Sequence, residues 1–221
     1  MNSLKKIKEW LNTFTPFNEQ EQVDCQHIRQ FLEEEPNLLL RDNVKMHFTA
    51  SAWVLNPKKD KVLMLYHNIY QSWSWSGGHA DGEGDLLSVA MKEVKEESGL
   101  LSLKPLLDMP LSIEILGVQP HYKKQKYVSA HLHLNYTFLL HNTKEEKLKI
   151  CPEENSKVGW LSPDEAVRSS TEAWMKPIYE KLNQKMREYK SGGRKRPQNN
   201  KVGAESAPKV AKWGQKAPPL P

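Results

Sequence analysis

One stretch, residues 77–100, constrains the fold more than any other part of the chain, and it reads GGHADGEGDLLSVAMKEVKEESGL. Two glycines follow a strand-like run, an acidic loop comes next, and a helical pattern then ends at Gly99, a residue type typical of helix ends. Within that helix the carboxylates are spaced i, i+3 and i+4 and therefore project from one face. They are Glu93, Glu96 and Glu97. An adjoining apolar face, which predicts packing on a core, consists of Leu87, Ala90, Met91 and Val94.

Three carboxylates on one helix face repel one another unless a cation neutralises them. Hard divalent cations such as Mg²⁺ and Mn²⁺ prefer oxygen ligands of this kind and often bridge to substrate phosphates. The alternative is a solvated helix face on which Lys92 and Glu96 form a weak i,i+4 pair. The glycine pair before the helix and the glycine stop after it favour the metal-binding interpretation.

The stretch resembles the Nudix box, whose pattern is G-x5-E-x7-R-E-U-x-E-E-x-G-U with U a bulky aliphatic residue. Gly78 matches the first glycine, and the second half of the pattern matches in register through Glu93, Val94, Glu96, Glu97, Gly99 and Leu100. Two positions depart from the pattern. Gly84 stands where the first Glu is expected, between Glu83 and Asp85, and Lys92 stands where the Arg is expected.

The resemblance implies an α/β fold in which a mixed β-sheet is sandwiched between helices, here over residues 45–190. It implies a hydrolase that cleaves the pyrophosphate bond of a nucleoside diphosphate linked to another moiety, with Mg²⁺ or Mn²⁺ as cofactor. By position in the box, Glu93, Glu96 and Glu97 are the metal ligands, joined by the main-chain carbonyl near Gly77. Lys92 is the fourth residue of the expected catalytic set, since it keeps the positive charge of the usual Arg but lacks its planar fork.

One of these three glutamates, or a further carboxylate from a later loop, would serve as general base. Glu153 and Glu154, in a loop before a predicted strand, are the candidates, and the alternative for both is a solvated loop pair. Substrate contacts are expected from His79, which follows the glycine pair, and from Tyr70, Trp73 and Trp75, which precede it. Each aromatic ring could stack on a base, or could instead pack in the core.

Two histidines, His131 and His133, share one face of a predicted strand because strand side chains alternate. Such a pair could meet a metal ion. No cysteine or further histidine follows at a useful spacing, so a polar cleft or a partner strand is the favoured environment.

Hydrophobic periodicity places the remaining elements. Helical patterns over residues 3–13 and 18–34 form an N-terminal extension, residues 1–44, which we interpret as cover for the core. Strand patterns follow over residues 47–56, 61–67, 111–119, 127–140 and 158–161, the first two as a hairpin. Residues 162–165 open a helix, and a last amphipathic helix is predicted over 172–189 with Trp174, Ile178, Leu182 and Met186 in step.

The formal net charge of +5 is localised in the tail. Residues 191–221 contain seven basic residues and one acidic residue, so residues 1–190 have a net charge of about −1. Few large apolar residues occur in this tail, and we expect it to be disordered. We interpret it as a solubilising extension in preference to an arm that binds nucleic acid, an interaction we expect at most weakly.

The expected location and partners of the protein follow from motifs and segments that are absent from the sequence. Cys25 and Cys151 are far apart and show no metal-ligand spacing, which favours reduced thiols and a cytoplasmic location. The chain shows no signal-peptide pattern and no apolar run of membrane-spanning length, so no membrane partner is expected. The expected partner is a small nucleotide or another diphosphate, and a homodimer is allowed.

Three other functions stay open at this level. The departures at Gly84 and Lys92 fit a nucleotide-binding or regulatory module that has lost turnover. A prenyl-diphosphate isomerase on the same fold would need a reactive cysteine in the central site, which neither Cys25 nor Cys151 matches well. An RNA-processing hydrolase would use the basic tail.

Overall fold

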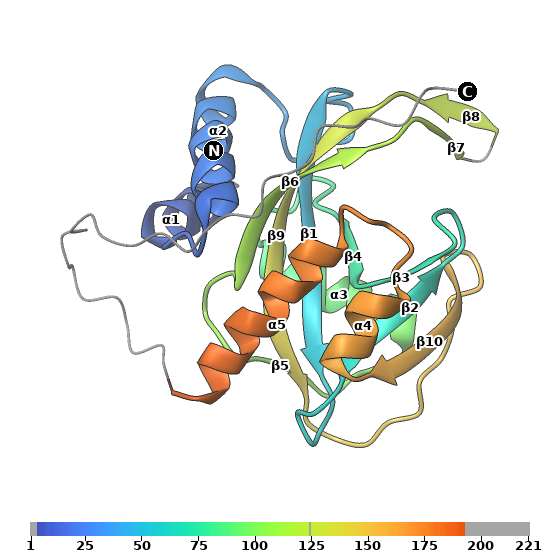
Figure 1. Cartoon of the computed structure of the whole chain (residues 1–221). Coiled ribbons are helices and arrows are strands. Elements are labelled where there is room, and N and C mark those ends of the chain that lie inside the picture. Colours follow the sequence, from blue (N-terminus) through green and yellow to red (C-terminus); the bar gives the residue numbers. More distant parts are fainter. Residues whose placement is uncertain (1–3, 124, 193–221) are drawn as a thin grey trace.

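The fold is built on one mixed β-sheet with helices on both faces (Figure 1). The computed structural model describes residues 4–123 and 125–192. The helices are α1 (Lys5–Thr13), α2 (Glu19–Glu34), α3 (Leu86–Ser98), α4 (Pro163–Ser169) and α5 (Lys176–Lys190). The strands are β1 (Met46–Leu55), β2 (Val62–His67), β3 (Ser72–Ser74), β4 (Ser76–His79), β5 (Leu103–Pro105), β6 (Ser112–Val118), β7 (His121–Lys123), β8 (Lys126–Val128), β9 (His131–Asn142) and β10 (Asn155–Leu161).

Strand β1 is the centre of the sheet and is buried along its whole length. The main strand order is β10-β2-β1-β9-β5, with β3 added to β2, β4 to β1 and β6 to β9. The β1–β9 pair is parallel, whereas the other pairs are antiparallel. The predicted α/β architecture with a mixed sheet between helices is therefore confirmed.

Each face of the sheet carries its own hydrophobic cluster. On one face, side chains of α3 such as Leu86 and Ala90 pack on Phe48 and other residues of the sheet. On the other face, α4 and α5 cover Trp53, which stacks on Tyr179 with ring centroids 5.4 Å apart. Successive side chains of a strand point to opposite faces, so neighbouring residues of β1 serve different clusters.

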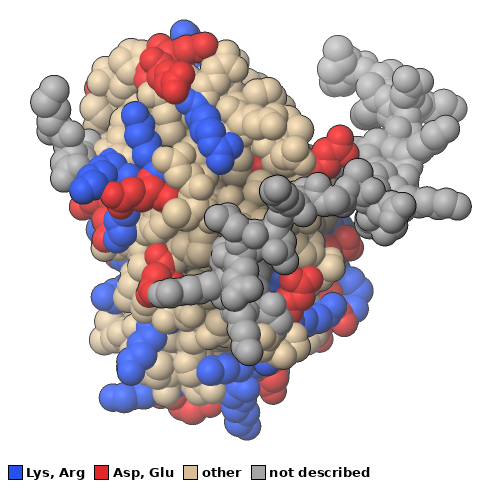
Figure 2. All heavy atoms as spheres, turned by 90° about the vertical axis from the view of Figure 1, so that its left-hand side faces the viewer, with Lys and Arg blue, Asp and Glu red and all other residues tan. Residues whose placement is uncertain are grey.

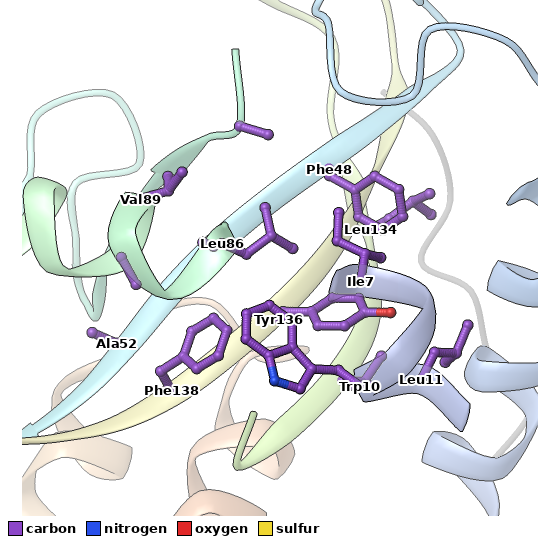
Figure 3. Packing of buried hydrophobic residues seen from close by; sticks show 14 of the residues in the cluster. Ile7, Trp10, Leu11, Phe48, Ala52, Leu86, Val89, Leu134, Tyr136 and Phe138 are labelled. Carbon is purple, nitrogen blue, oxygen red and sulfur yellow. The ribbon is translucent and has the colours of Figure 1, made fainter. Parts of the chain in front are cut away.

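The N-terminal helices pack into the first of these clusters, as the core-cover interpretation expected. Ile7, Trp10 and Leu11 of α1 are buried with residues of α3 and the sheet. Figure 3 shows the Trp10 ring beside Tyr136 and Phe138, and its centroid lies 5.2 Å from that of Phe138. The Trp10 indole N–H donates to the carbonyl of Asp108 at 3.0 Å, which gives the polar edge of this buried ring a partner.

Three details differ from the sequence-based prediction. The last helix begins at Lys176 and not at residue 172, and Trp174 precedes it with 54% of its surface exposed. Pro177 explains the late start because proline is tolerated in the first turn of a helix but not farther in. The strand expected over 127–140 is divided, since β8 belongs to a separate hairpin with β7 and β9 begins only at His131. Short strand β5 was not predicted.

The surface agrees with the near-neutral charge of residues 1–190. Figure 2 shows Lys and Arg interspersed with Asp and Glu on the face that it presents. The predicted disordered tail lies outside the described residues, except for Ser191 and Gly192. Within the part of the chain that the structure describes, no helix combines the length and apolar character needed to span a membrane.

Candidate active site

The glycine pair and the glutamate helix meet by direct contact between β4 and α3. A β-carbon added to Gly78 would lie 2.3 Å from the carboxyl carbon of Glu93, so only glycine leaves room for this side chain. The helix is fixed at both ends: Asp85 caps its first turn, and Gly99 ends it with a left-handed φ of 74°. The loop and the helix therefore hold the Glu93 carboxylate against the backbone of β4.

Glu97 lies deeper in the same interface, with 7% of its surface exposed. Its carboxylate accepts hydrogen bonds from the Ser76 hydroxyl and from the backbone N–H of Gly77. The backbone carbonyl of the same residue accepts a hydrogen bond from the Asn155 side chain at 3.0 Å, which joins α3 to the start of β10. Local contacts thus orient Glu97 toward the glycine pair.

The carboxylates of the site crowd one another. The pKa of Glu97 is raised to about 8, chiefly by burial and in part by the nearby Glu93 and Glu154, against the opposing hydrogen bond from Ser76. Burial likewise raises the pKa of Glu93, with added repulsion from Glu96 and Glu154. Each raised pKa means that too few protein cations lie near these carboxylates to offset their negative charge when they are ionised. A bound divalent ion would supply that positive charge.

Glu96 lies on the solvent side of the helix. Its carboxylate is 3.7 Å from the Lys92 ammonium, and both side chains are exposed. The weak pair expected for a solvated helix face is therefore present at these two positions, while Glu93 and Glu97 point inward. Such an exposed pair contributes little to stability and leaves both groups available to a ligand.

Of the two loop carboxylates expected as extra bases, Glu154 lies nearer the helix. It acts electrostatically on both Glu93 and Glu97 and is half-buried, whereas Glu153 is exposed. The hydrogen bonds of Asn155 to Cys151 and Glu97 hold this loop beside α3.

Comparison with known proteins assigns the chain to a family. A family model described as the NUDIX domain matches residues 45–182. The chain belongs to the NUDIX family. It is accordingly a hydrolase of the class that acts on pyrophosphate bonds. No curated protein sequence matches the chain.

Several solved structures are similar to this NUDIX chain. An Ap4A hydrolase binary complex from C. elegans is 18% identical with a TM-score of 0.49, covering 66% of this chain and 98% of that one. The dihydroneopterin triphosphate pyrophosphohydrolase of E. coli is 18% identical with a TM-score of 0.46, covering 62% of this chain and 92% of that one. RenU, a Nudix hydrolase from M. smegmatis, is 14% identical with a TM-score of 0.47, covering 70% of this chain and 90% of that one.

The departures from the NUDIX box have visible local consequences. Gly84 is buried, and the two acidic residues beside it are engaged in the loop. Glu83 accepts a hydrogen bond from the backbone N–H of Asp85 at 2.7 Å, and Asp85 pairs with Lys6 of α1 at 2.7 Å while capping α3. In this arrangement both acids stabilise the loop–helix junction.

The aromatic residues expected to contact substrate differ in exposure. Tyr70 is exposed, and its ring lies tilted against that of His67 with ring centroids 4.5 Å apart. Trp73 and Trp75 are half-buried against the second hydrophobic cluster, and Trp75 packs edge-on against Tyr179 at 5.5 Å. Tyr70 therefore offers the more accessible ring, and the two tryptophans follow the core-packing alternative in part.

His79 lies on the other face of β4 from the carboxylates. Gly78 faces Glu93, so the next side chain points the opposite way, where it meets His47 and His133. The pKa of His133 is lowered to about 2, chiefly by burial and in part by the neighbouring imidazoles. His47 escaped the sequence analysis because its proximity to His133 follows from the parallel pairing of β1 with β9, a non-local register that no spacing along the chain reveals.

Proposed function

We propose that this protein is a metal-dependent pyrophosphohydrolase that cleaves a nucleoside diphosphate linked to another moiety. The observation that carries the proposal is the placement of Glu93 and Glu97 against the glycine pair, where inward-facing carboxylates meet a close-approaching backbone. A solvated helix face would leave all three glutamates exposed, and only Glu96 behaves in that way.

The donor set fits Mg²⁺ or Mn²⁺. Glu93, Glu97 and, from the exposed side, Glu96 would hold the ion through carboxylate oxygens, with the main-chain carbonyl of Gly77 as a further ligand. Gly78 supports this fit because its missing β-carbon leaves the space in which Glu93 lies. When bound, the divalent ion neutralises phosphate charge and lowers the pKa of water.

Other groups of the chain would handle the proton and the substrate. Glu154 is suited to accept a proton from water because it is half-buried and close enough to Glu93 and Glu97 to act on both electrostatically. Lys92 is exposed on the same helix and would meet negative charge on a phosphate or on Glu96. The exposed ring of Tyr70 provides a surface on which a nucleobase can stack.

A substrate panel tests the proposal. Tag-free protein would be incubated with nucleoside diphosphates linked to sugars, to alcohols and to second nucleotides, in the presence of Mg²⁺, Mn²⁺ or EDTA. Products would be resolved by chromatography. Metal-dependent cleavage of a pyrophosphate bond supports the proposal. Binding of a nucleotide with no turnover under either metal would instead support the regulatory module that Gly84 and Lys92 suggest.

Gly78→Ala is expected to reduce kcat/KM for the best substrate of that panel by about 10–100-fold, the loss typical when support of a metal ligand is disturbed. The new methyl group would displace Glu93, whose carboxyl carbon lies 2.3 Å from its position. Gly117→Ala in β6 is the matched control, since its added methyl meets nothing within 4 Å. Equal activity of the two variants would show that the Glu93 position is unimportant.

A further inference from the structure

Four histidines from three strands form a cluster on the face of the sheet opposite the carboxylates. They are His47 of β1, His79 of β4, and His131 and His133 of β9. The ring centroid of His47 lies 5.1 Å from that of His79 and 5.0 Å from those of both His131 and His133. The third ligand that the sequence did not supply for His131 and His133 is thus provided by the fold.

Strand pairing explains the convergence. His47 pairs directly with His133 in the parallel β1–β9 ladder, and His79 pairs with Thr49, two residues farther along β1. Because residues i and i+2 of a strand share a face, all of these side chains point the same way. The ring nitrogens of His47, His79 and His133 that face one another lie within 4.8 Å.

The hydrogen bonds of the cluster are those of metal-binding histidines. Nδ1 of His47 lies 3.1 Å from the carbonyl oxygen of Asn43, and Nδ1 of His131 lies 2.9 Å from that of Ser129. A carbonyl can only accept, so in both rings Nδ1 carries the proton and Nε2 presents a lone pair. Backbone anchoring of one ring nitrogen typically orients the other toward a metal.

The buried Nε2 of His47 adds an independent observation. It has no hydrogen-bond partner among the described residues, although His47 is only 4% exposed. A buried, unpaired acceptor costs free energy unless a ligand satisfies it. Nε2 of His131, for its part, lies 3.2 Å from Nε2 of His133.

We propose that His47, His79 and His133 bind a divalent transition-metal ion of the Zn²⁺ class, with His131 at the fourth position. Imidazole nitrogens suit Zn²⁺, whereas Mg²⁺ and Mn²⁺ prefer the oxygen ligands of α3. Zn–N bonds of about 2.0–2.1 Å in a tetrahedral site place ligand nitrogens about 3.3 Å apart, so the rings close in by about 1.5 Å or less from their present separations. The ion would join β1, β4 and β9 beside Gly78 and act as a structural clamp for the end of β4.

Zinc titration of tag-free full-length protein tests this site. The protein would be stripped with EDTA, exchanged into excess Mg²⁺ to occupy the carboxylates, and titrated with ZnCl₂ against a chromophoric chelator. About one Zn²⁺ per chain is expected with a Kd below about 1 μM, and Tm should rise by about 5–10 °C at a 100-fold excess over Kd. Co²⁺ in place of Zn²⁺ should give the intense visible absorption of a tetrahedral site.

Matched variants locate the ion. His79→Gln and His133→Gln should weaken Zn²⁺ binding by more than about 100-fold, since losing even a supporting residue costs about 10–100-fold. His27→Gln, on the outer surface of α2, should bind as the wild type does, and so should Glu97→Gln. Zinc binding lost in Glu97→Gln but kept in the histidine variants would overturn the proposal, as would a wild-type Kd above about 100 μM.

Spectra of the wild-type protein test the zinc site without depending on whether the histidine variants fold. Imidazole ¹⁵N spectra should show that Zn²⁺ shifts the nitrogen resonances of four histidines, while those of His27 and His141 stay in place. Shifts confined to exposed histidines outside the cluster would contradict the site.

Discussion

Glu97→Gln is expected to lower kcat/KM by about 10²–10³-fold, because one charged ligand of the metal site would be lost while the shape of the side chain is kept. A loss of several kcal/mol in charge stabilisation corresponds to that range. Steady-state kinetics with Mg²⁺ and with Mn²⁺ would measure it. Glu96→Gln should act in the same direction, and undiminished turnover in both single variants would contradict the assignment of α3 as the metal-binding helix.

The fold of the Glu97→Gln variant should survive, which separates lost chemistry from lost structure. Burial raises the pKa of Glu97 to about 8, so in the metal-free protein at neutral pH the carboxyl is largely protonated and Gln reproduces its neutral form. The metal-free variant should therefore unfold at about the wild-type Tm but gain less Tm on addition of Mg²⁺. Glu180→Gln, an exposed change on α5, is the control for general effects of charge.

The part of the site that lies within one helix, α3, could be predicted from the sequence. Glu93, Glu96 and Glu97 share a face by helical periodicity alone, and Gly78 and Gly99 mark the ends of the segment. Periodicity could not separate the inward Glu93 and Glu97 from the exposed Glu96, because that depends on where β4 lies against α3. The histidine cluster lay beyond prediction for a similar reason, since it depends on the register of three strands.

In the fold, too, patterns within one segment could be predicted, whereas features that depend on distant segments could not. Long strands with clear apolar patterns, β1, β2 and β6, were predicted nearly to their ends. The division between β8 and β9 was missed because Ser129 and Ala130 are compatible with a continuing strand, and only the departure of the β7–β8 hairpin shows where the sheet ends. Local pattern therefore gives the type of an element more reliably than its limits.

A buried ionic network at the junction of α2, β6 and α5 also escaped the sequence analysis. The Glu21 carboxylate accepts from the ammonium of Lys185, from the Ser112 hydroxyl at 2.6 Å and from the backbone N–H of Phe17 at 2.7 Å. Lys181 lies 3.2 Å from Glu21 and 2.9 Å from Glu114. Burial opposes the charge on Glu21, but the two lysines prevail and hold its pKa below the usual value. Glu21 is therefore the central anion of a network that joins the N-terminal extension to the last helix.

Glu21→Gln is expected to lower the free energy of unfolding by about 3–5 kcal/mol, with a decrease in Tm of about 10 °C. The substitution leaves the ammonium of Lys185, which is fully buried, without its carboxylate partner. An uncompensated buried charge costs more than the ion pair contributed, so the loss exceeds that for an ordinary hydrogen bond. Urea unfolding followed by tryptophan fluorescence would measure it, with Glu33→Gln on the exposed side of α2 as the control, expected within about 0.5 kcal/mol of the wild type.

A second substitution distinguishes a stranded charge from a loss of packing. Adding Lys185→Met to Glu21→Gln removes the unpaired ammonium while keeping an unbranched side chain beside the rings of Phe14 and Phe17, which Lys185 now contacts. The double variant should regain at least half of the lost stability, as replacement of buried ion pairs by apolar residues often does. If the double variant were less stable than Glu21→Gln alone, the electrostatic explanation would be wrong, and the contribution of Lys185 would lie in its packing against Phe14 and Phe17, between α1 and α2.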